Sequence, residues 1–168
     1  MYVFICISGV VLGHEGGMLA GLVHPVMLYA PMIPIGSGKQ WFPWIHVQDL
    51  ASMIVFAIEN DKVTGVLNGV APQSAKNMDF TKAFCKAFHK ISYGPLAVPG
   101  FAMDLVYGSD RAKMVLEGQR VVPERPLALG FQFSFPDIDG AMKDISLRQK
   151  LFVAGITGRG FNGPSRFQ

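Results

Sequence analysis

The pattern of apolar and polar positions alternates between strand-like and helix-like segments. Residues 2–12 form a nearly continuous apolar run rich in Val and Ile, ended by Gly13. Such a run is typical of a strand buried on both faces inside a parallel sheet. A helix is expected over 18–29, and apolar residues recur at helical spacing over 49–60 before a short strand over 63–70. This order of elements predicts an α/β fold.

A Gly/Ser loop that runs into an aromatic strand is found at residues 36–50. Both tryptophans of the chain, Trp41 and Trp44, lie in it, and His46 follows. Two residues three apart on a strand point to opposite faces, so one Trp is expected to face the core and the other a pocket. For His46, a hydrogen bond to a backbone carbonyl is favoured over a catalytic or substrate role. Asp49 is expected to cap the next helix by accepting backbone N–H groups.

The second half of the chain is predicted to consist of shorter elements. After a Pro/Ser loop over 71–76, Asn77 is expected to cap a helix with Phe80, Phe84, Ala87 and Phe88 on one face. An extended stretch, two short helices, a strand and a helical turn that ends at Gly130 are then expected, in that order: 93–99, 101–107, 110–116, 119–122 and 123–129.

The last ordered elements predicted are a strand and a helix. Residues 131–135 alternate phenylalanine with polar residues, as a half-buried strand does. Pro136 suits the first turn of a helix that runs to about Ile145. The pattern then fails, and 146–168, which ends in a Gly- and Arg-rich stretch, is predicted to be a disordered tail.

Composition narrows the classes of function. Half of the 168 residues are hydrophobic and only 16% are charged, below the usual quarter. Such a chain either touches a membrane or buries apolar surface against something that this sequence does not contain. The net charge of +3 comes from scattered residues, which argues against nucleic-acid binding.

Cysteine spacing and targeting signals favour an intracellular protein, cytoplasmic or mitochondrial. Cys6 and Cys85 lack metal-ligand spacing, so reduced thiols are favoured over a disulfide or a metal site. The first residues have neither a positively charged start nor a cleavage motif, so no signal peptide is expected. The apolar stretch 18–35 holds three prolines and a histidine and is a poor candidate for a membrane-spanning helix.

Motifs that would mark a complete enzyme site are missing from this sequence. It contains no G-x-G-x-x-G turn between a strand and a helix, no G-x-S-x-G, no P-loop and no H-E-x-x-H. Tyr107 is followed four residues later by Arg111, but arginine keeps its proton and is a poor relay. No catalytic residue and no metal ligand is therefore predicted.

Four segments, taken together and in order, resemble one family: 8–13 (SGVVLG), 36–50, 65–72 (GVLNGVAP) and 116–133 (LEGQRVVP followed by GFQF). They are similar to the second half of the epimerase-like, atypical short-chain dehydrogenase/reductases of the 39U branch. Members of this branch end in a small C-terminal domain of unknown function. The resemblance covers about residues 7–145, which is most of the chain.

The resemblance implies an incomplete, C-terminal half of a Rossmann-type NAD(P)-binding fold. Residues 1–72 would belong to the Rossmann domain and 73–145 to the small α/β C-terminal domain. The family's first half carries the glycine-rich cofactor turn and the Tyr/Lys region, and the matched segments begin after both. The family usually has Arg before Ser8, where this chain has Ile7.

The resemblance also assigns candidate contacts. Ser8, Gly9, Val10 and Val11 would touch the nicotinamide end of NADP, with Val11 the best candidate. The resemblance adds Asn68 to five substrate-pocket candidates that the loop and the aromatic strand themselves suggest, Ser37, Lys39, Gln40, Trp44 and His46. Two alternatives stay open, since Lys39 could hold an anionic substrate group or be solvated, and Asn68 could face the pocket or serve a turn.

The first functional hypothesis is the substrate-side half of an NADP-dependent, epimerase-like oxidoreductase, inactive and without tight NADP binding when alone. Its substrate would be an unidentified small molecule with a carbonyl or hydroxyl group. The alternative is a non-catalytic module that binds a protein partner, or itself, through an exposed apolar sheet edge. Attachment to a membrane through 1–12 and 18–35 is the least favoured.

Overall fold

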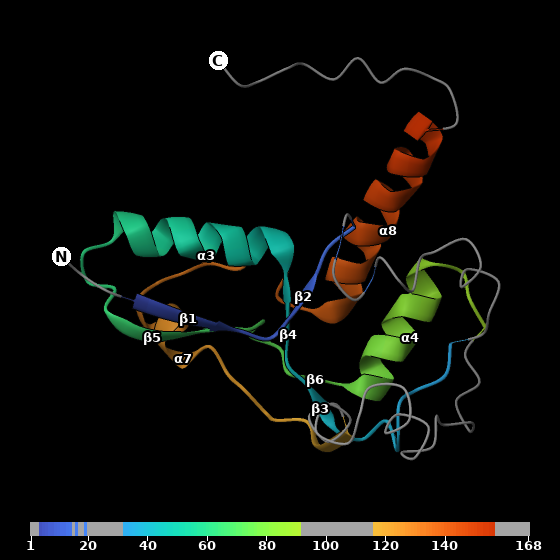
Figure 1. Ribbon diagram of the computed structural model, residues 1–168, viewed down its shortest axis with the longest axis horizontal. Helices are drawn as coiled ribbons and strands as arrows, with labels where there is room; N and C mark the ends of the chain where they lie inside the picture. Colours follow the sequence, from blue (N-terminus) through green and yellow to red (C-terminus); the bar gives the residue numbers. More distant parts are fainter. Residues whose placement is uncertain (1–3, 15, 17–18, 20–31, 92–115, 157–168) are drawn as a thin grey trace.

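A computed structural model describes residues 4–14, 16, 19, 32–91 and 116–156. The expected helix over 18–29 and the elements expected over 93–99, 101–107 and 110–115 lie outside these residues. The rest confirms an α/β fold with parallel strands. In Figure 1, helix α3 (Val47–Glu59) accompanies the strands at one end of the molecule, and helices α4 (Asn77–Ala87) and α8 (Ile138–Ile156) pack together at the other.

The apolar run at the start of the chain forms two strands that change partner at Gly9. β1 (Phe4–Ser8) pairs in parallel with β5 (Gly65–Gly69), and β2 (Val10–Leu12) pairs in parallel with β4 (Trp44–His46). The Gly9 N–H donates to the Gly69 carbonyl at 3.0 Å. A Cβ at Gly9 would collide with the Pro43 carbonyl, so only glycine fits between the two ladders.

The expectation that this run is buried on both faces is wrong for β1. Phe4 and Cys6 are half-buried under α3, whereas Ile5 and Ile7 are 56% and 55% exposed. The reason is that the described residues supply neither a second strand beside β1 nor a layer over its outer face. Burial therefore alternates along β1 with the two-residue period of a one-sided strand.

A third, antiparallel pair joins β3 (Trp41–Phe42) to β6 (Ala75–Lys76). β6 lies inside the segment expected to be only a loop. Residues 119–122, expected to be a strand, form no regular element. They follow Gly118, whose positive φ of 57° brings its backbone directly against that of Trp41, too close for any side chain.

The predicted helix starts need correction. α3 begins two residues before Asp49, and its N-cap is His46. The N-cap of α4 is Lys76, and Asn77 is already in the helix, where its Oδ1 accepts from the Ile35 N–H at 2.9 Å. The predicted aromatic face of α4 is confirmed, because its phenylalanines pack in the largest cluster.

The last described helix extends further than the sequence pattern predicts. The turn α7 (Glu124–Ala128) forms and ends before Gly130, whose φ is +88°, as expected. The last helix, α8, begins at Ile138 and continues to Ile156, so the expected tail is wrong for 146–156. Contacts support the continuation past Ile145, because Ser146 is buried and Arg148 bonds to Asp144 one turn earlier.

Residues 131–135 do not form the expected strand. Their side chains still alternate, with Phe131 buried and Gln132 exposed. In place of a neighbouring strand, the Asp49 carboxylate accepts the N–H groups of Ser134 and Phe135 at 2.8 and 2.9 Å. A side chain therefore satisfies the backbone that a sheet would otherwise satisfy.

The core is divided unequally between the two ends. The largest cluster joins β2, β4, α4 and α8, and it includes Leu12, Trp44, Phe84 and Met142, each at most 1% exposed. Two smaller clusters lie between α3, the β1–β5 pair and the 129–133 segment. Among the described residues, no helix is both long and apolar enough to cross a bilayer.

Candidate functional site

Ser8 to Val11, the residues assigned to the cofactor, lie where β1 ends and β2 begins. This is the carboxyl end of the parallel β1–β5 pair, the edge at which ligands bind in open α/β sheets. Ser8 is exposed, and Gly9, Val10 and Val11 are half-buried. The N–H groups of Gly9 and Val10 already donate to the carbonyls of Gly69 and Pro43.

These residues fit only one end of a dinucleotide. The apolar Val10 and Val11 could contact a flat ring, but a pyrophosphate needs free N–H groups, as at a helix N-terminus. The N–H groups of Gly9 and Val10 are both engaged in backbone hydrogen bonds. Residues 8–11 line neither of the two hollows described below. Gly9 and Val10 therefore supply no free N–H group for a phosphate, and the predicted contact of residues 8–11 with the nicotinamide end is untested.

Asn68 lies on β5, opposite Ile7, near the same edge. Its Nδ2 donates to the Val122 carbonyl at 3.1 Å, so the amide holds the 116–122 segment against the sheet. Its predicted substrate contact is untested, while this structural contact explains the residue without a ligand.

The 36–40 loop is a compact turn with Gly36 and Gly38 at positive φ. Ser37 and Lys39 are exposed, and the Lys39 N–H donates to the Ser37 hydroxyl oxygen at 3.2 Å. Gln40 is buried, and its Nε2 donates to the Ile35 carbonyl at 2.8 Å. Ser37 and Lys39 are thus accessible to a ligand, whereas Gln40 closes the turn.

The two tryptophans occupy different environments, as their spacing predicts. Trp44 is 1% exposed in the largest cluster, so the residue assigned to the substrate is a core residue. Trp41 is the tryptophan that reaches the surface. Lys76 Nζ and Arg120 Cζ lie 5.5 and 5.2 Å from the centre of its indole, within cation–π range.

His46 is buried at the junction of α3 and α8. Its Nδ1 accepts the Gln48 N–H at 3.2 Å, which caps α3 and corrects the expected bond to a carbonyl. The ring stacks on Phe135 with centres 3.9 Å apart, and Nε2 lies 3.4 Å from Asp144 Oδ2. Burial lowers the pKa of His46, although the carboxylates of Asp144 and Asp49 act in the opposite direction. The cap of α3 and the contact with Phe135 account for His46 without a ligand, and its predicted substrate contact is untested.

Asp49 has a different partner from the one predicted. Its buried carboxylate reaches Ser134 and Phe135, far along the chain, instead of the first turn of its own helix. Asp144 and Arg120 were missed by sequence reasoning. The i,i+4 spacing between Asp144 and Arg148 could have indicated this pair. Asp144 accepts a 2.6 Å hydrogen bond from Arg148 and raises the pKa of that guanidinium. Nothing local relates Arg120 to Trp41.

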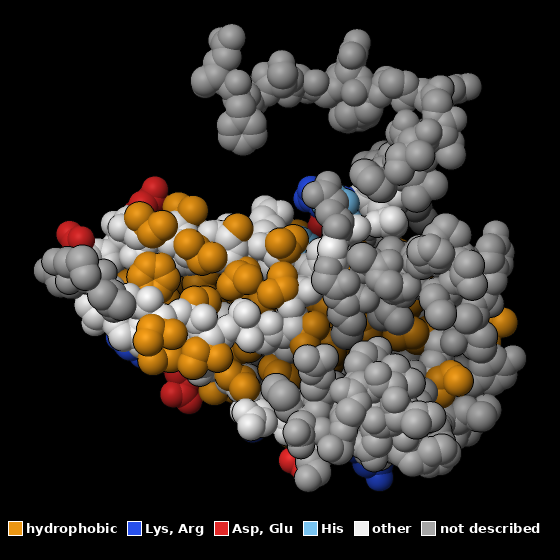
Figure 2. Space-filling view, in the orientation of Figure 1, with side chains coloured by type: hydrophobic (Ala, Val, Ile, Leu, Met, Phe, Trp, Pro, Cys, Tyr) orange, Lys and Arg blue, Asp and Glu red, His pale blue; other side chains and the backbone are white. Residues whose placement is uncertain are grey.

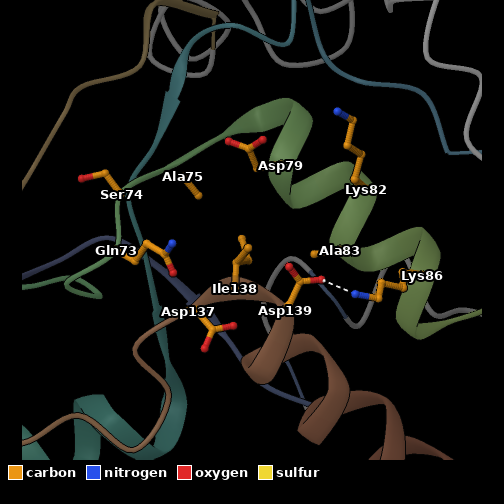
Figure 3. A pocket seen from close by; sticks show the side chains of 10 residues that line it. All are labelled: Gln73, Ser74, Ala75, Asp79, Lys82, Ala83, Lys86, Asp137, Ile138 and Asp139. Atoms are coloured by element: carbon orange, nitrogen blue, oxygen red, sulfur yellow. Dashed lines mark hydrogen bonds and ion pairs between the residues drawn. The ribbon is translucent and has the colours of Figure 1, made fainter.

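Two hollows border these residues. The α4–α8 hollow, of about 590 Å³, lies between α4 and the start of α8, where Lys86 Nζ pairs with Asp139 Oδ1 at 3.3 Å (Figure 3). The Trp41 hollow, of about 10 Å³, is bordered by Trp41, Trp44, Ala71, Ser74, Gln119 and Arg120. No group of three His, Cys, Asp or Glu side chains in the described ranges could hold a metal ion.

Comparison with known proteins shows where this arrangement recurs. Residues 9–68 match the NAD dependent epimerase/dehydratase family, and residues 98–145 match a domain of unknown function, DUF1731. The epimerase family protein SDR39U1 of Homo sapiens is 47% identical over 138 residues, which are 82% of this chain and 46% of that protein. A chloroplastic homolog from Arabidopsis thaliana is 39% identical over 82% of this chain and 38% of its own length.

A solved structure gives the same result. The crystal structure of human SDR39U1 (isoform 2) with NADPH superposes with a TM-score of 0.80 at 44% identity, over 86% of this chain and 48% of that one. The chain has an epimerase-family fold. The predicted resemblance to epimerase-like reductases and the predicted Rossmann-type class are thereby confirmed.

The chain spans about half the length of the epimerase-family relatives that it matches. A second structure, the nucleoside-diphosphate sugar epimerase of Corynebacterium glutamicum, has a TM-score of 0.61 at 25% identity and covers 91% of this chain but 30% of that protein. The family match over residues 9–68 includes both Gly9–Val11 and the Trp41–His46 segment. The boundary predicted between a Rossmann part and a small domain at residue 72 is untested.

Proposed function

We propose that this chain forms the substrate-side half of an NADP-dependent, epimerase-like oxidoreductase and binds NADP weakly, if at all, without the other half. One observation carries the proposal, the uncovered end of the molecule around β1. It consists of the exposed apolar residues of β1, β5 and α3, here called the open end: Ile5, Ile7, Val66, Val47, Ile54, Val55 and Ile58. Figure 2 shows hydrophobic side chains gathered over this end, with few charges.

An exposed surface of this kind is costly for an isolated domain. Each large apolar side chain that stays in water forgoes about 1.5–3 kcal/mol of burial. Within the described residues, β1 has one neighbouring strand, so its outer backbone edge is unpaired. Further parallel strands and helices of a Rossmann domain would cover both the edge and the apolar side chains. The coverage of about half of each relative's length supports the same conclusion.

The division of labour follows from the residues present. NADP, when bound, would supply hydride transfer to or from a carbonyl or hydroxyl group of an unidentified small molecule. Ser8 to Val11 would bound the nicotinamide end, and Ser37 and Lys39 would be free to contact the substrate. His46 would not transfer a proton at this edge, because it is buried and caps α3.

A calorimetric titration with NADPH tests this proposal. The chain alone is expected to give no micromolar affinity, because the N–H groups of Gly9 and Val10, at the candidate cofactor edge, are already engaged, and the sequence lacks a glycine-rich pyrophosphate turn. The same titration after mixing with the part of the human relative that this chain does not match should restore binding. Micromolar affinity of the chain alone would contradict the proposal, and so would a failure of the two parts to associate.

The unpaired edge of β1 also supports a second candidate function, a non-catalytic module that adds a strand from a protein partner or from another copy. Static light scattering and an apolar dye distinguish this alternative. A monomer that binds no dye would remove it. Concentration-dependent association without any NADPH binding in the mixed sample would favour it over the first proposal.

A further inference from the structure

The Trp41 hollow has an unusual balance of charge. Within the described residues neither Lys76 nor Arg120 forms an ion pair, yet both side chains lie against the same indole. No Asp or Glu borders this hollow, whereas three carboxylates border the α4–α8 hollow. Both cations contact the same indole and neither is held by a carboxylate of the described residues, so the positive charge around Trp41 favours an anion.

The other polar groups at the hollow point to the same chemistry. Trp44 borders it, and in the described part of the chain its buried indole N–H has no acceptor. An indole N–H is a donor only, as are the ammonium of Lys76 and the guanidinium of Arg120. A set of donors in which no carboxylate competes is suited to a ligand that only accepts, namely phosphate or carboxylate oxygens.

The position connects this cluster with the candidate site. The hollow is also bordered by Pro43, Val70 and Ala71, which adjoin the carboxyl end of the β1–β5 pair. Lys76 is fixed beside Trp41 by the β3–β6 register, and Gly118 holds the Arg120 segment directly on the Trp41 backbone. Two segments that are far apart in sequence therefore each place one cation against the Trp41 indole.

We propose that Lys76, Arg120 and the Trp41 hollow form a subsite for an anionic group, phosphate or carboxylate, of the small molecule that this half contacts. The proposal rests on the proposed function for the identity of that molecule as a substrate, but not for anion binding itself. The volume of about 10 Å³ admits roughly one water-sized atom. One oxygen would therefore enter the hollow, while the rest of the group contacts Arg120, which borders the hollow, and Lys76, which lies over the Trp41 ring.

The two tryptophans of the chain both border the hollow, so intrinsic fluorescence reports directly on it. The full chain is titrated with sodium phosphate, and separately with sodium acetate, at an ionic strength held constant with sodium chloride. A saturable change with phosphate or acetate is expected, and none with chloride alone. Response to one anion and not the other identifies which oxygen chemistry the site takes.

Matched charge deletions decide whether these residues are responsible. Lys76→Gln and Arg120→Gln should each lower the affinity for the anion by about tenfold, the usual effect of losing one charge-assisted contact. Lys82→Gln, which removes the same charge from the α4–α8 hollow, should leave it unchanged, with far-UV circular dichroism confirming the fold of all three. An absent or unsaturable signal, or equal weakening in Lys82→Gln, would overturn the proposal.

This test and the NADPH test fail separately. Phosphate or acetate binding without cofactor binding in the mixed sample would leave the subsite and remove the proposed function. Cofactor binding in the mixed sample without any anion response would support the proposed function and remove the anion subsite.

Discussion

The two ends of this molecule bury apolar residues to very different extents. At the α4–α8 end, Phe84, Trp44 and Met142 are at most 1% exposed in one continuous cluster. At the open end, Ile58 is 70% exposed, and Ile5 and Ile7 more than half. The sequence is apolar in both places, so composition does not cause the difference. What differs is whether the chain itself supplies the second layer, as α8 does for α4.

An apolar sequence pattern predicts that a side chain is buried, but the side chain is buried only where another layer of the fold packs against it. The run at 2–12 reads as a strand buried on both sides, and its high apolar content fits a complete sheet. Its outer face is exposed because the partner layer is not among the described residues. The exposed isoleucines are therefore the strongest single indication of a missing partner.

The largest contrast is expected from truncating one large side chain at each end. Phe84→Ala should lower the free energy of unfolding by about 3–5 kcal/mol, because it opens a cavity in a filled cluster. Ile58→Ala, at an exposed position, should change it by less than about 0.5 kcal/mol. Urea denaturation of both variants checks this. Similar losses would mean that the open end is covered in solution.

The junction between the ends should be nearly as sensitive at Asp49. Asp49→Ala leaves the N–H groups of Ser134 and Phe135 without their acceptor, and about 3 kcal/mol of stability should be lost. Asp49→Asn keeps one acceptor oxygen, so its stability should lie between those of Asp49→Ala and the parent chain. Asp139→Ala, which removes an exposed carboxylate, is the matched control and should cost less than about 1 kcal/mol. Equal effects at both aspartates would contradict the contact.

A smaller effect is expected from pH at His46. Because burial lowers the pKa of His46 in the folded chain, the unfolded chain binds more protons once the pH falls below the ordinary value of about 6.5. Stability should be full above that pH and decline below it, by at most about 1.4 kcal/mol per pH unit from this residue. Besides Asp144, Asp49 and Arg148, His14 also acts on the ring.

His46→Asn isolates this contribution. Asparagine can still accept the Gln48 N–H as a helix cap, but it does not titrate. Urea midpoints measured at about pH 7.5 and about pH 5.5 should therefore differ less in the variant than in the parent. An unchanged difference would show that other groups carry the pH dependence.

The smallest effect on stability is expected at the open end. Ile7→Lys should change the free energy of unfolding by less than about 0.5 kcal/mol, because the side chain is already in water. It should nevertheless reduce light scattering and dye binding, because a lysine on an edge strand opposes pairing with another chain. Leu147→Lys, at a similarly exposed site on α8, is the control and should reduce neither. Equal reductions would show that apolar exposure in general, and not the edge, causes association.

Local features of the fold could be predicted from the sequence. The helical spacing over 49–60 and the aromatic face of Phe80, Phe84 and Phe88 are confirmed, because each depends on residues within a few turns. The opposite environments of Trp41 and Trp44 also follow from local geometry. The stop at Gly130 was predictable for the same reason.

Features that depend on distant residues could not be predicted. Asp49 is a residue type that commonly caps helices, but its carboxylate accepts hydrogen bonds from the N–H groups of Ser134 and Phe135. The division of the first strand at Gly9 depends on Pro43 and Gly69, and the burial of His46 depends on α8. The two cations at Trp41 come from residues 76 and 120, which no spacing rule connects.

The change of partner at Gly9 has a consequence for how the chain folds. β2 joins β4 across about 34 residues, whereas β1 joins β5 across about 61. Closing the longer loop costs more chain entropy, and parallel ladders between distant segments form slowly. β1 is thus expected to be the last strand secured, and its apolar edge stays available during the slowest phase of folding. In a cell, a second copy could compete for the β5-facing edge of β1 until that final pairing, and for the outer edge afterwards as well.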